Sequence, residues 1–254
     1  MFWGRITPKS SSAQDTDELG RNLSIIELSG SWMFLASVVK ILAEDLGFTR
    51  SAETGTAVLG DGEPIPMLAY GAVEYLMGLD FSDRHVCEFG GGNSTRFWSR
   101  RAASVTTLDN DRVWYRALEE DALANVAVHF TEAGGMPDLF RRLGRGFDVI
   151  VIDCRDNRYD CCTAARPALN EGGLIILDNS EWYGNCAAYL RDSGLIQVDF
   201  HDFRACHHHR TTTSLFLDRA FTPKPKGAVQ PAVPIGGKAA SGGNWDRPSQ
   251  QAKT

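Results

Sequence analysis

A run of glycines beside polar side chains is the first part of the sequence that could bind a ligand. The stretch CEFGGGNSTRFW places Glu88 before Gly90 and Gly92, with Asn93 and Ser94 after them. Glycine permits tight turns and close approach to another group, and it is costly inside a helix or a strand. Asparagine and serine commonly cap the first turn of a helix, where backbone amides are free. The stretch therefore predicts a ligand-binding loop between a strand and a helix.

Acidic or amide side chains stand at the ends of four other short apolar runs. Asp109 ends SVTTLD, Glu132 and Ala133 follow VAVHFT, Asp153 ends FDVIVID, and Asp178 and Asn179 end GLIILDN. The carboxyl ends of parallel strands meet at one edge of a sheet, and ligands bind at that edge in open α/β sheets. These side chains are therefore candidate ligand-binding or catalytic groups.

The elements that must position these residues alternate along the chain. Apolar runs predict strands, and segments with helical spacing predict helices between them. The predicted strands are 85–89, 104–109, 126–131, 147–153 and 173–179, and the predicted helices are 34–46, 68–77, 94–102, 111–124, 160–169 and 185–193. Continuous apolar strands that alternate with helices indicate a parallel sheet covered on both faces.

The last two predicted strands, 196–203 and 212–219, break this alternation. The connection RACHHHRT is too short for the crossover that parallel neighbours need, so these strands must run antiparallel. Consecutive histidines diverge in direction, and we expect His207–His209 to form a solvent-exposed loop rather than a metal site.

These features together resemble the class I S-adenosylmethionine (SAM) dependent methyltransferases. Dinucleotide enzymes use G-x-G-x-x-G, whereas this sequence has an acid first, as Glu88-x-Gly90-x-Gly92-x-Ser94. The resemblance implies a Rossmann-like α/β fold, with a seven-stranded, mostly parallel sheet, helices on both faces and an antiparallel terminal strand. It also implies that Asp109 holds the ribose hydroxyls of SAM. The cofactor-binding residues expected on this basis are Glu88, Gly90, Gly92, Asn93, Ser94, Asp109, Glu132 and Ala133.

The acceptor side of the expected site depends on Asp153, which would orient or deprotonate the methyl acceptor. Asp153, Asp178 and Asn179 resemble the oxygen ligands of magnesium in the cation-dependent, catechol-type O-methyltransferases. Arg155 and Arg158 stand where that family has a lysine base, and arginine does not give up its proton. A metal site and a simple helix-capping role for Asp178 and Asn179 both remain open.

The chain divides by composition into four segments. Residues 1–21 and 222–254 are polar or rich in proline and glycine, which predicts disordered tails. Residues 22–80 are expected to form a helical cap or lid, and residues 81–221 the SAM-binding core. In the methyltransferase superfamily the segment before the glycine strand often packs over the cleft, so Tyr70 is expected in the acceptor pocket.

The composition favours a small molecule as the partner. A net charge of -6 and a pI near 5.5 lack the basic surface that nucleic acid binding requires. Six cysteines without metal-ligand spacing predict buried free thiols and a cytoplasmic location. No apolar run is long enough to span a membrane. The helix at Trp32 is expected to be a lid or a dimer face, so a homodimer is also considered.

The expected function is methyl transfer from SAM to an oxygen, or a nitrogen, of a small molecule, with oxygen favoured. An NAD-dependent dehydrogenase would want G-x-G-x-x-G and no terminal hairpin. An aminopropyltransferase-like enzyme would need further acids near the fourth strand, where Asp156 and Asp160 occur beside two arginines. A non-catalytic SAM-fold scaffold or regulatory protein remains open because the sequence contains no unmistakable catalytic base.

Overall fold

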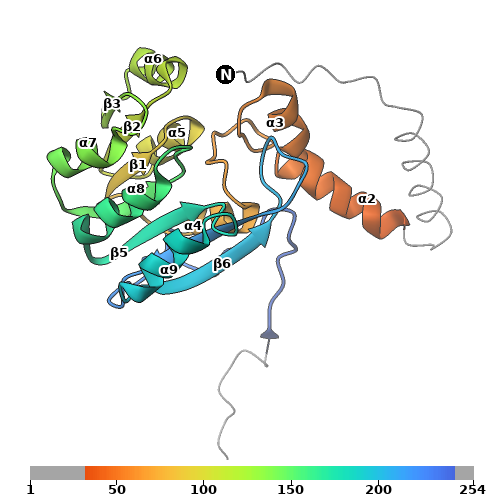
Figure 1. The fold of residues 1–254 in the computed structure, drawn as a ribbon. Coiled ribbons are helices and arrows are strands. Elements are labelled where there is room, and N and C mark those ends of the chain that lie inside the picture. The colour runs from red at the N-terminus through yellow and green to blue at the C-terminus, as the bar shows by residue number, and fades with distance from the viewer. Residues whose placement is uncertain (1–31, 244–254) are drawn as a thin grey trace, which may run out of the picture.

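The computed structural model describes residues 32–243, which fold around one sheet of seven strands (Figure 1). The strand order is β3-β2-β1-β4-β5-β7-β6, and β7 runs antiparallel to both of its neighbours. The strands are β1 (His85–Phe89), β2 (Ser104–Asp109), β3 (Val126–Phe130), β4 (Phe147–Ile152), β5 (Leu169–Asp178), β6 (Ile196–Asp202) and β7 (Thr211–Leu217). The structure confirms the predicted Rossmann-like α/β fold. The antiparallel strand is last in the chain, but it lies between β5 and β6 in the sheet.

The helices of the described residues connect these strands. They are α2 (Trp32–Lys40), α3 (Phe48–Thr54), α4 (Tyr70–Met77), α5 (Asn93–Ser99), α6 (Arg112–Asp121), α7 (Met136–Leu143), α8 (Arg158–Ala165) and α9 (Gly184–Asp192). A π-helical turn, η1 (Ile41–Asp45), follows α2, and a short 3-10 helix, η2 (Arg166–Ala168), precedes β5. Helices α3 and α7 are not among the helices predicted from the sequence. Helix α7 is a short helix bounded by Gly135 and Gly144, and glycines at both ends are more typical of a loop.

The strands bury side chains on both faces because alternate residues point to opposite sides of a sheet. On one face, Val86 and Val151 pack with α4 and α5, whose largest buried side chain is Trp98. On the other face, Cys87 and Ile150 pack against α7, α8 and α9. These two cores hold the strand ends in fixed positions relative to one another.

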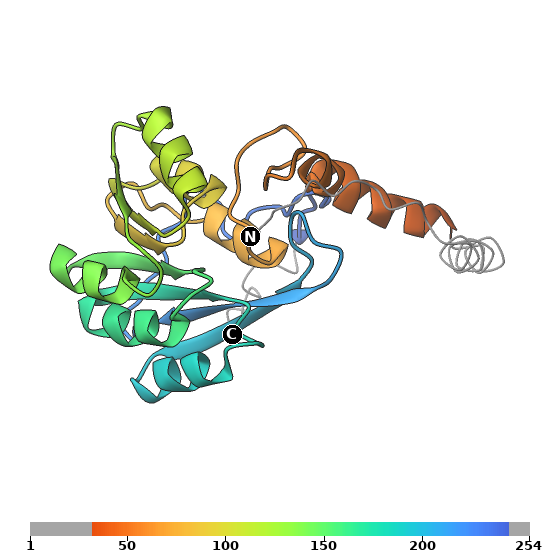
Figure 2. The same ribbon diagram turned by 45° about the horizontal axis from the view of Figure 1, so that its top comes forward.

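Helix α2 projects away from the body of the protein (Figures 1 and 2). All of its residues are exposed, including Phe34 at 77%. The predicted helix 34–46 is therefore present as α2 followed by η1, and Gly47 ends it with φ of 71°. No helix in residues 32–243 has the length and apolar character needed to cross a membrane. The homodimer suggested by this exposed helix stays a prediction.

The C-terminal segment differs from the disordered tail predicted over 222–254. The amide of Asp80 donates to the carbonyl of Lys224 at 2.7 Å, and the amide of Ile235 donates to Glu74 Oε1 at 2.5 Å. The segment is therefore attached to α4 and to the residues that follow it, through backbone groups and the packed side chain of Ile235. Contacts of this kind leave no periodic apolar pattern in the sequence. The N-terminal tail predicted at 1–21 lies outside the described residues, as does 244–254.

Candidate functional site

The glycine loop follows β1, at the point in the sheet where the order of successive strands reverses. Strand β1 has β2 on one side and β4 on the other, and such a switch point is where open α/β sheets bind ligands. The amide of Gly90 donates to the carbonyl of Leu108 at 2.8 Å. Gly90 has φ of +97°, and a Cβ there would lie 3.1 Å from the carbonyl oxygen of Asp153. The first glycine therefore lets the loop pass close to the end of β4.

The next two glycines face different surroundings. A Cβ on Gly91 would lie 2.7 Å from side-chain atoms of Leu118 and Thr107, so that position is closed by packing. The three atoms nearest to a Cβ on Gly92 would all belong to the ring of Trp114, the first at 3.7 Å, which is an ordinary van der Waals contact. Gly92 has φ of +152°, which side-chain-bearing residues rarely adopt. The loop is therefore open at Gly92, on the side where Trp114 stands.

Glu88 lies fully buried beneath this loop. Thr107 Oγ1 donates to Glu88 Oε2 at 3.1 Å, while Oε1 is buried and has no hydrogen-bond partner. Burial raises the pKa of Glu88 to about 7, and the hydroxyls of Thr95, Ser94 and Thr107 oppose that rise. The predicted cofactor contact is therefore a buried carboxyl group with one free oxygen at the base of the loop.

Asp109 supports the loop from the end of β2. Its Oδ2 accepts from the amide of Gly91 at 2.8 Å, and its Oδ1 accepts from the amide of Asp111 at 2.7 Å. Only 4% of Asp109 is exposed, and burial raises its pKa against the effect of these amides. Asp111 in turn caps α6 by accepting from the amide of Val113. Asp109 thus joins the glycine loop to the start of α6.

The other predicted cofactor residues lie around this loop. Asn93 begins α5, and its Nδ2 donates to the carbonyl of Ala57 at 2.7 Å. Ser94 follows it in the first turn, close enough to Glu88 to lower the pKa of that carboxyl. Glu132 and Ala133 are exposed beyond the end of β3, where Glu132 forms an ion pair of 2.6 Å with Arg112.

Two aspartates and two arginines form a charged network beyond β4 and β5. Arg158 Nη2 pairs with Asp153 Oδ1 at 3.2 Å, and Arg204 Nη1 pairs with Asp178 Oδ2 at 3.0 Å. The side chains of both arginines are buried, as is Asp178, whereas 33% of the Asp153 side chain is exposed. Desolvation raises the pKa of Asp153, and the charges of Arg158 and Arg204 oppose that rise. Asp153 is the accessible carboxylate of this network.

The residues do not fit the predicted magnesium site. The carboxylate of Asp178 already accepts from Thr213 Oγ1 at 2.7 Å and from Arg204, and the amide group of Asn179 donates to Thr211. Magnesium requires oxygen ligands that are free to face it, and a nearby guanidinium repels it. Within residues 32–243, no group of three or more His, Cys, Asp or Glu side chains is arranged to hold a metal.

Tyr70, predicted in the acceptor pocket, lies in the core at the start of α4. It is 1% exposed, and its hydroxyl is buried without a hydrogen-bond partner, so burial raises its pKa above the ordinary value. The predicted loop His207–His209 lies between β6 and β7, where His208 is exposed and the other two are half-buried. The cysteines in the described residues are free thiols, and all but Cys206 are buried.

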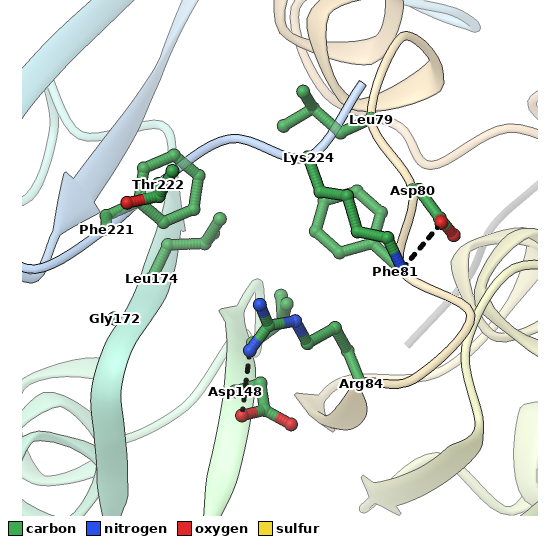
Figure 3. A pocket seen from close by; sticks show the side chains of 11 residues that line it. Leu79, Asp80, Phe81, Arg84, Asp148, Gly172, Leu174, Phe221, Thr222 and Lys224 are labelled. Atoms are coloured by element: carbon green, nitrogen blue, oxygen red, sulfur yellow. Dashed lines mark ion pairs between the residues drawn. The ribbon is translucent and has the colours of Figure 1, made fainter. Parts of the chain in front are cut away.

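A separate pocket lies at the other end of the strands, away from the glycine loop (Figure 3). Its charged groups already have partners, since Lys224 pairs with Asp80 at 2.9 Å and Arg84 with Asp148 at 3.6 Å. Ligands of open α/β sheets bind beyond the carboxyl ends of the strands, and this pocket lies at their amino ends. We therefore assign the candidate site to the glycine loop.

The sequence did not identify several groups that shape this site. Trp114 is not among the predicted site residues, although its position in the first turn of α6, five residues after Asp109, is a usable signal. Arg204 lies in the connection between β6 and β7, and no local pattern indicates that it reaches the end of β5. The hydroxyl groups of Thr95, from α5, and Thr107, from β2, lie beside the carboxyl group of Glu88.

Among the comparisons with known proteins, only the comparison of folds finds similar proteins. No protein-family model matches it, and no curated protein sequence matches it. Similar solved structures include a putative caffeoyl-CoA O-methyltransferase from Staphylococcus aureus (12% identity, 73% of this chain and 98% of that chain, TM-score 0.48). Others are the O-methyltransferase TomG from Streptomyces achromogenes (18%, 54% and 74%, 0.46) and an rRNA methylase from Streptococcus thermophilus (12%, 57% and 91%, 0.42). These are named as methyltransferases, the class that the glycine stretch resembles, but such low identities and TM-scores transfer neither activity nor ligand.

Proposed function

We propose that the chain is a SAM-dependent methyltransferase that acts on an oxygen or nitrogen of a small molecule, with oxygen favoured. The observation that carries this proposal is the position of the glycine loop. The loop lies at the switch point between β1 and β4. Neighbouring side chains leave no room for a side chain at Gly91, whereas the backbone at Gly92 can be approached beside the ring of Trp114. The antiparallel β7 accompanies this loop, as in the methyltransferase version of the Rossmann-like fold.

The residues around the loop fit SAM. Gly92 offers close backbone approach beside the ring of Trp114, and Asp109 and Glu132 provide carboxylates beyond β2 and β3. Glu88 lies buried at the base of the loop, where one of its oxygens has no hydrogen-bond partner. When bound, SAM supplies a methyl group on a cationic sulfur. Gly90, Asn93, Ser94 and Ala133 complete the proposed binding residues.

Asp153 is the proposed catalytic residue. It follows β4 next to the glycine loop, and part of its side chain reaches solvent. A carboxylate there can align the acceptor or take its proton, and alignment supplies much of the rate in such a displacement. The positive charges of Arg158 and Arg204 lower the pKa of Asp153. The same charges would repel a cationic polyamine, which disfavours an aminopropyltransferase.

Calorimetry with S-adenosylhomocysteine tests the proposal. We expect micromolar binding by the wild-type protein, at least about tenfold weaker binding by Asp109→Asn, and unchanged binding by the exposed control Asp192→Asn. Absence of binding by the folded wild-type protein would overturn the proposal and favour a non-catalytic scaffold.

Two expectations about the setting of this reaction stay predictions. A small-molecule acceptor, rather than nucleic acid, is supported by the net charge of -6. A cytoplasmic location is supported by the free thiols of the described cysteines.

A further inference from the structure

Helix α2 carries a wide apolar face that is exposed along its whole length. Five large apolar side chains recur at helical spacing and form this face, which we call the α2 face: Trp32, Phe34, Leu35, Val38 and Val39. Between 37% and 77% of each of these residues is exposed. Met33, Ser37 and Lys40 occupy the other side of the helix. An amphipathic helix normally buries its apolar side, so the α2 face lacks the partner that its sequence implies.

The base of α2 is firmly attached to the body of the protein. Leu42 and Leu46, which follow α2, pack against the core beneath the sheet. The amide of Leu46 donates to the carbonyl of Ile41 at 2.8 Å, and the amide of Gly60 donates to the carbonyl of Asp45 at 3.3 Å. Helix α2 therefore projects from an anchored base (Figures 1 and 2).

The size of the α2 face suits a pair of identical helices. A whole aromatic side chain has about 150–250 Å² of surface and an aliphatic one somewhat less, so the exposed fractions of the five residues sum to roughly 500 Å². Exposed apolar patches of this size often mark interaction sites. Two such faces in contact would remove roughly 1,000 Å² from water, which is about the least that a specific protein interface buries.

The charges around α2 disfavour a membrane surface as the partner. Helices that lie on membranes carry several lysines or arginines on their polar side. Lys40 is the one charged residue of α2, and it already pairs with Asp45 at 2.9 Å and with Glu44 at 3.8 Å. The α2 face itself has no charged residue. Two copies can therefore meet through this face without bringing like charges together.

The rest of the described chain has no apolar surface that matches the α2 face. Elsewhere in residues 32–243, large apolar side chains are exposed singly, such as Val113 on α6, or in pairs, such as Ile196 and Val198 on β6. Contact between α2 and one of these positions would join molecules head to tail, and such contacts can continue into open assemblies. Contact between two α2 faces instead gives a closed pair with twofold symmetry.

We propose that the α2 face packs against the α2 face of a second copy of this chain, which makes the protein a twofold symmetric dimer. Leu35 and Val39 lie near the middle of this interface, because they lie between Trp32 on one side and Phe34 and Val38 on the other. The interface does not depend on the proposed methyl transfer.

Sedimentation velocity of the full chain tests the dimer. We expect a reversible equilibrium between monomer and dimer, with a micromolar dissociation constant because the interface is of the smallest specific size. Val39→Glu places a charge in the middle of the α2 face and should weaken dimerisation at least about tenfold. Ser37→Glu introduces the same charge on the opposite side of α2 and should dimerise like the wild type. Both positions are exposed, so both variants should fold, which circular dichroism checks.

A wild-type protein that stays monomeric up to about 100 µM, well above a micromolar dissociation constant, would overturn the proposal. So would equal dimerisation of Val39→Glu and Ser37→Glu, which would place the interface elsewhere, or a series of larger oligomers in place of a dimer. Cosedimentation with vesicles of phosphatidylcholine and phosphatidylserine tests the lipid alternative. We expect no binding to these vesicles, and a monomer that binds them through α2 would identify a membrane surface as the partner instead.

Discussion

Arg158 Nη1 donates a hydrogen bond of 2.5 Å to the main-chain oxygen of Asp178, which ties the start of α8 to the end of β5. The same guanidinium donates through Nε to the carbonyl of Cys154 at 2.7 Å and pairs with Asp153. Its Cζ lies 4.2 Å from the ring centre of Tyr183. One buried cation therefore fixes the two strand ends that carry the proposed acceptor side of the site.

Removing this cation should destabilise the fold. In Arg158→Met, Asp153 loses its ion-pair partner and two carbonyl groups lose their donor. Removal of one partner from a buried ion pair typically costs about 3–5 kcal/mol, and we expect about 3 kcal/mol because Asp153 is partly exposed. Urea unfolding measures the difference. The control Arg142→Met changes an exposed arginine of α7 and should alter stability by less than about 0.5 kcal/mol. Similar stability in the two variants would contradict this role.

Glu88 should make stability depend on pH. Its folded-state pKa of about 7 lies above the ordinary value of 4.5, so the folded state binds the proton more tightly than the unfolded chain. This contribution to stability is fully present below the ordinary pKa and is lost as pH rises through about 7. Glu88→Gln removes the titration, so its stability relative to wild type should rise by on the order of 2–3 kcal/mol between about pH 5 and pH 8.

Urea unfolding of both proteins across that pH range checks the expected difference. Glu120→Gln, at an exposed position of α6, serves as the control and should follow the wild-type pH dependence. A constant gap between Glu88→Gln and wild type would show that Glu88 is ionised in the folded protein throughout this range.

Gly91 should be intolerant of even one methyl group. In Gly91→Ala the new Cβ would lie 2.7 Å from atoms of Leu118 and Thr107, and such overpacking costs about 1–3 kcal/mol. Gly184→Ala at the start of α9 meets nothing within 4 Å and should be nearly neutral. Thermal unfolding of the two variants measures the contrast. Equal melting temperatures would mean that the loop is less closely packed at Gly91 than described.

Magnesium should not stabilise the protein. A ligand that binds only the folded state raises the melting temperature, but Asp153 and Asp178 already have arginine partners. We expect the same melting temperature in magnesium chloride and in sodium chloride of equal ionic strength, with and without S-adenosylhomocysteine. A rise specific to magnesium would restore the metal site suggested by the resemblance to catechol-type enzymes.

The C-terminal segment should contribute to stability. A chain that ends at Phe221 loses the hydrogen bond between Asp80 and Lys224 and the packing of Ile235, which together we estimate at about 2–3 kcal/mol. A chain that ends at Gly243 keeps these contacts and serves as the reference for the shorter chain. Chemical denaturation compares the two chains, and equal stability of the shorter chain would contradict this contribution.

The sequence predicted the fold well because the sheet depends on local patterns. Each predicted strand is present in the structure, with ends that differ by a few residues at most, since buried parallel strands appear as apolar runs. The short connection between β6 and β7 was sufficient to predict their antiparallel pairing. The glycine loop and Asp109 were predicted from their positions at strand ends, and the structure places them together.

The remaining features depend on contacts between distant segments. The pairing of Arg204 with Asp178 joins residues from separate connections, and no spacing rule indicates it. Tyr70 was expected to line a pocket, but the packing around α4 buries it. The attachment of Lys224 beside Asp80 uses backbone groups, which every residue carries, so composition alone indicated disorder.

A crystal structure with S-adenosylhomocysteine tests whether the glycine loop is the SAM site. We expect ligand density over Gly92 beside the ring of Trp114, with the ribose next to Asp109. Ligand density at another place, such as the pocket beside Lys224, would contradict the assignment of the glycine loop as the SAM site. The same result would follow from a glycine loop that stays empty in the presence of saturating ligand.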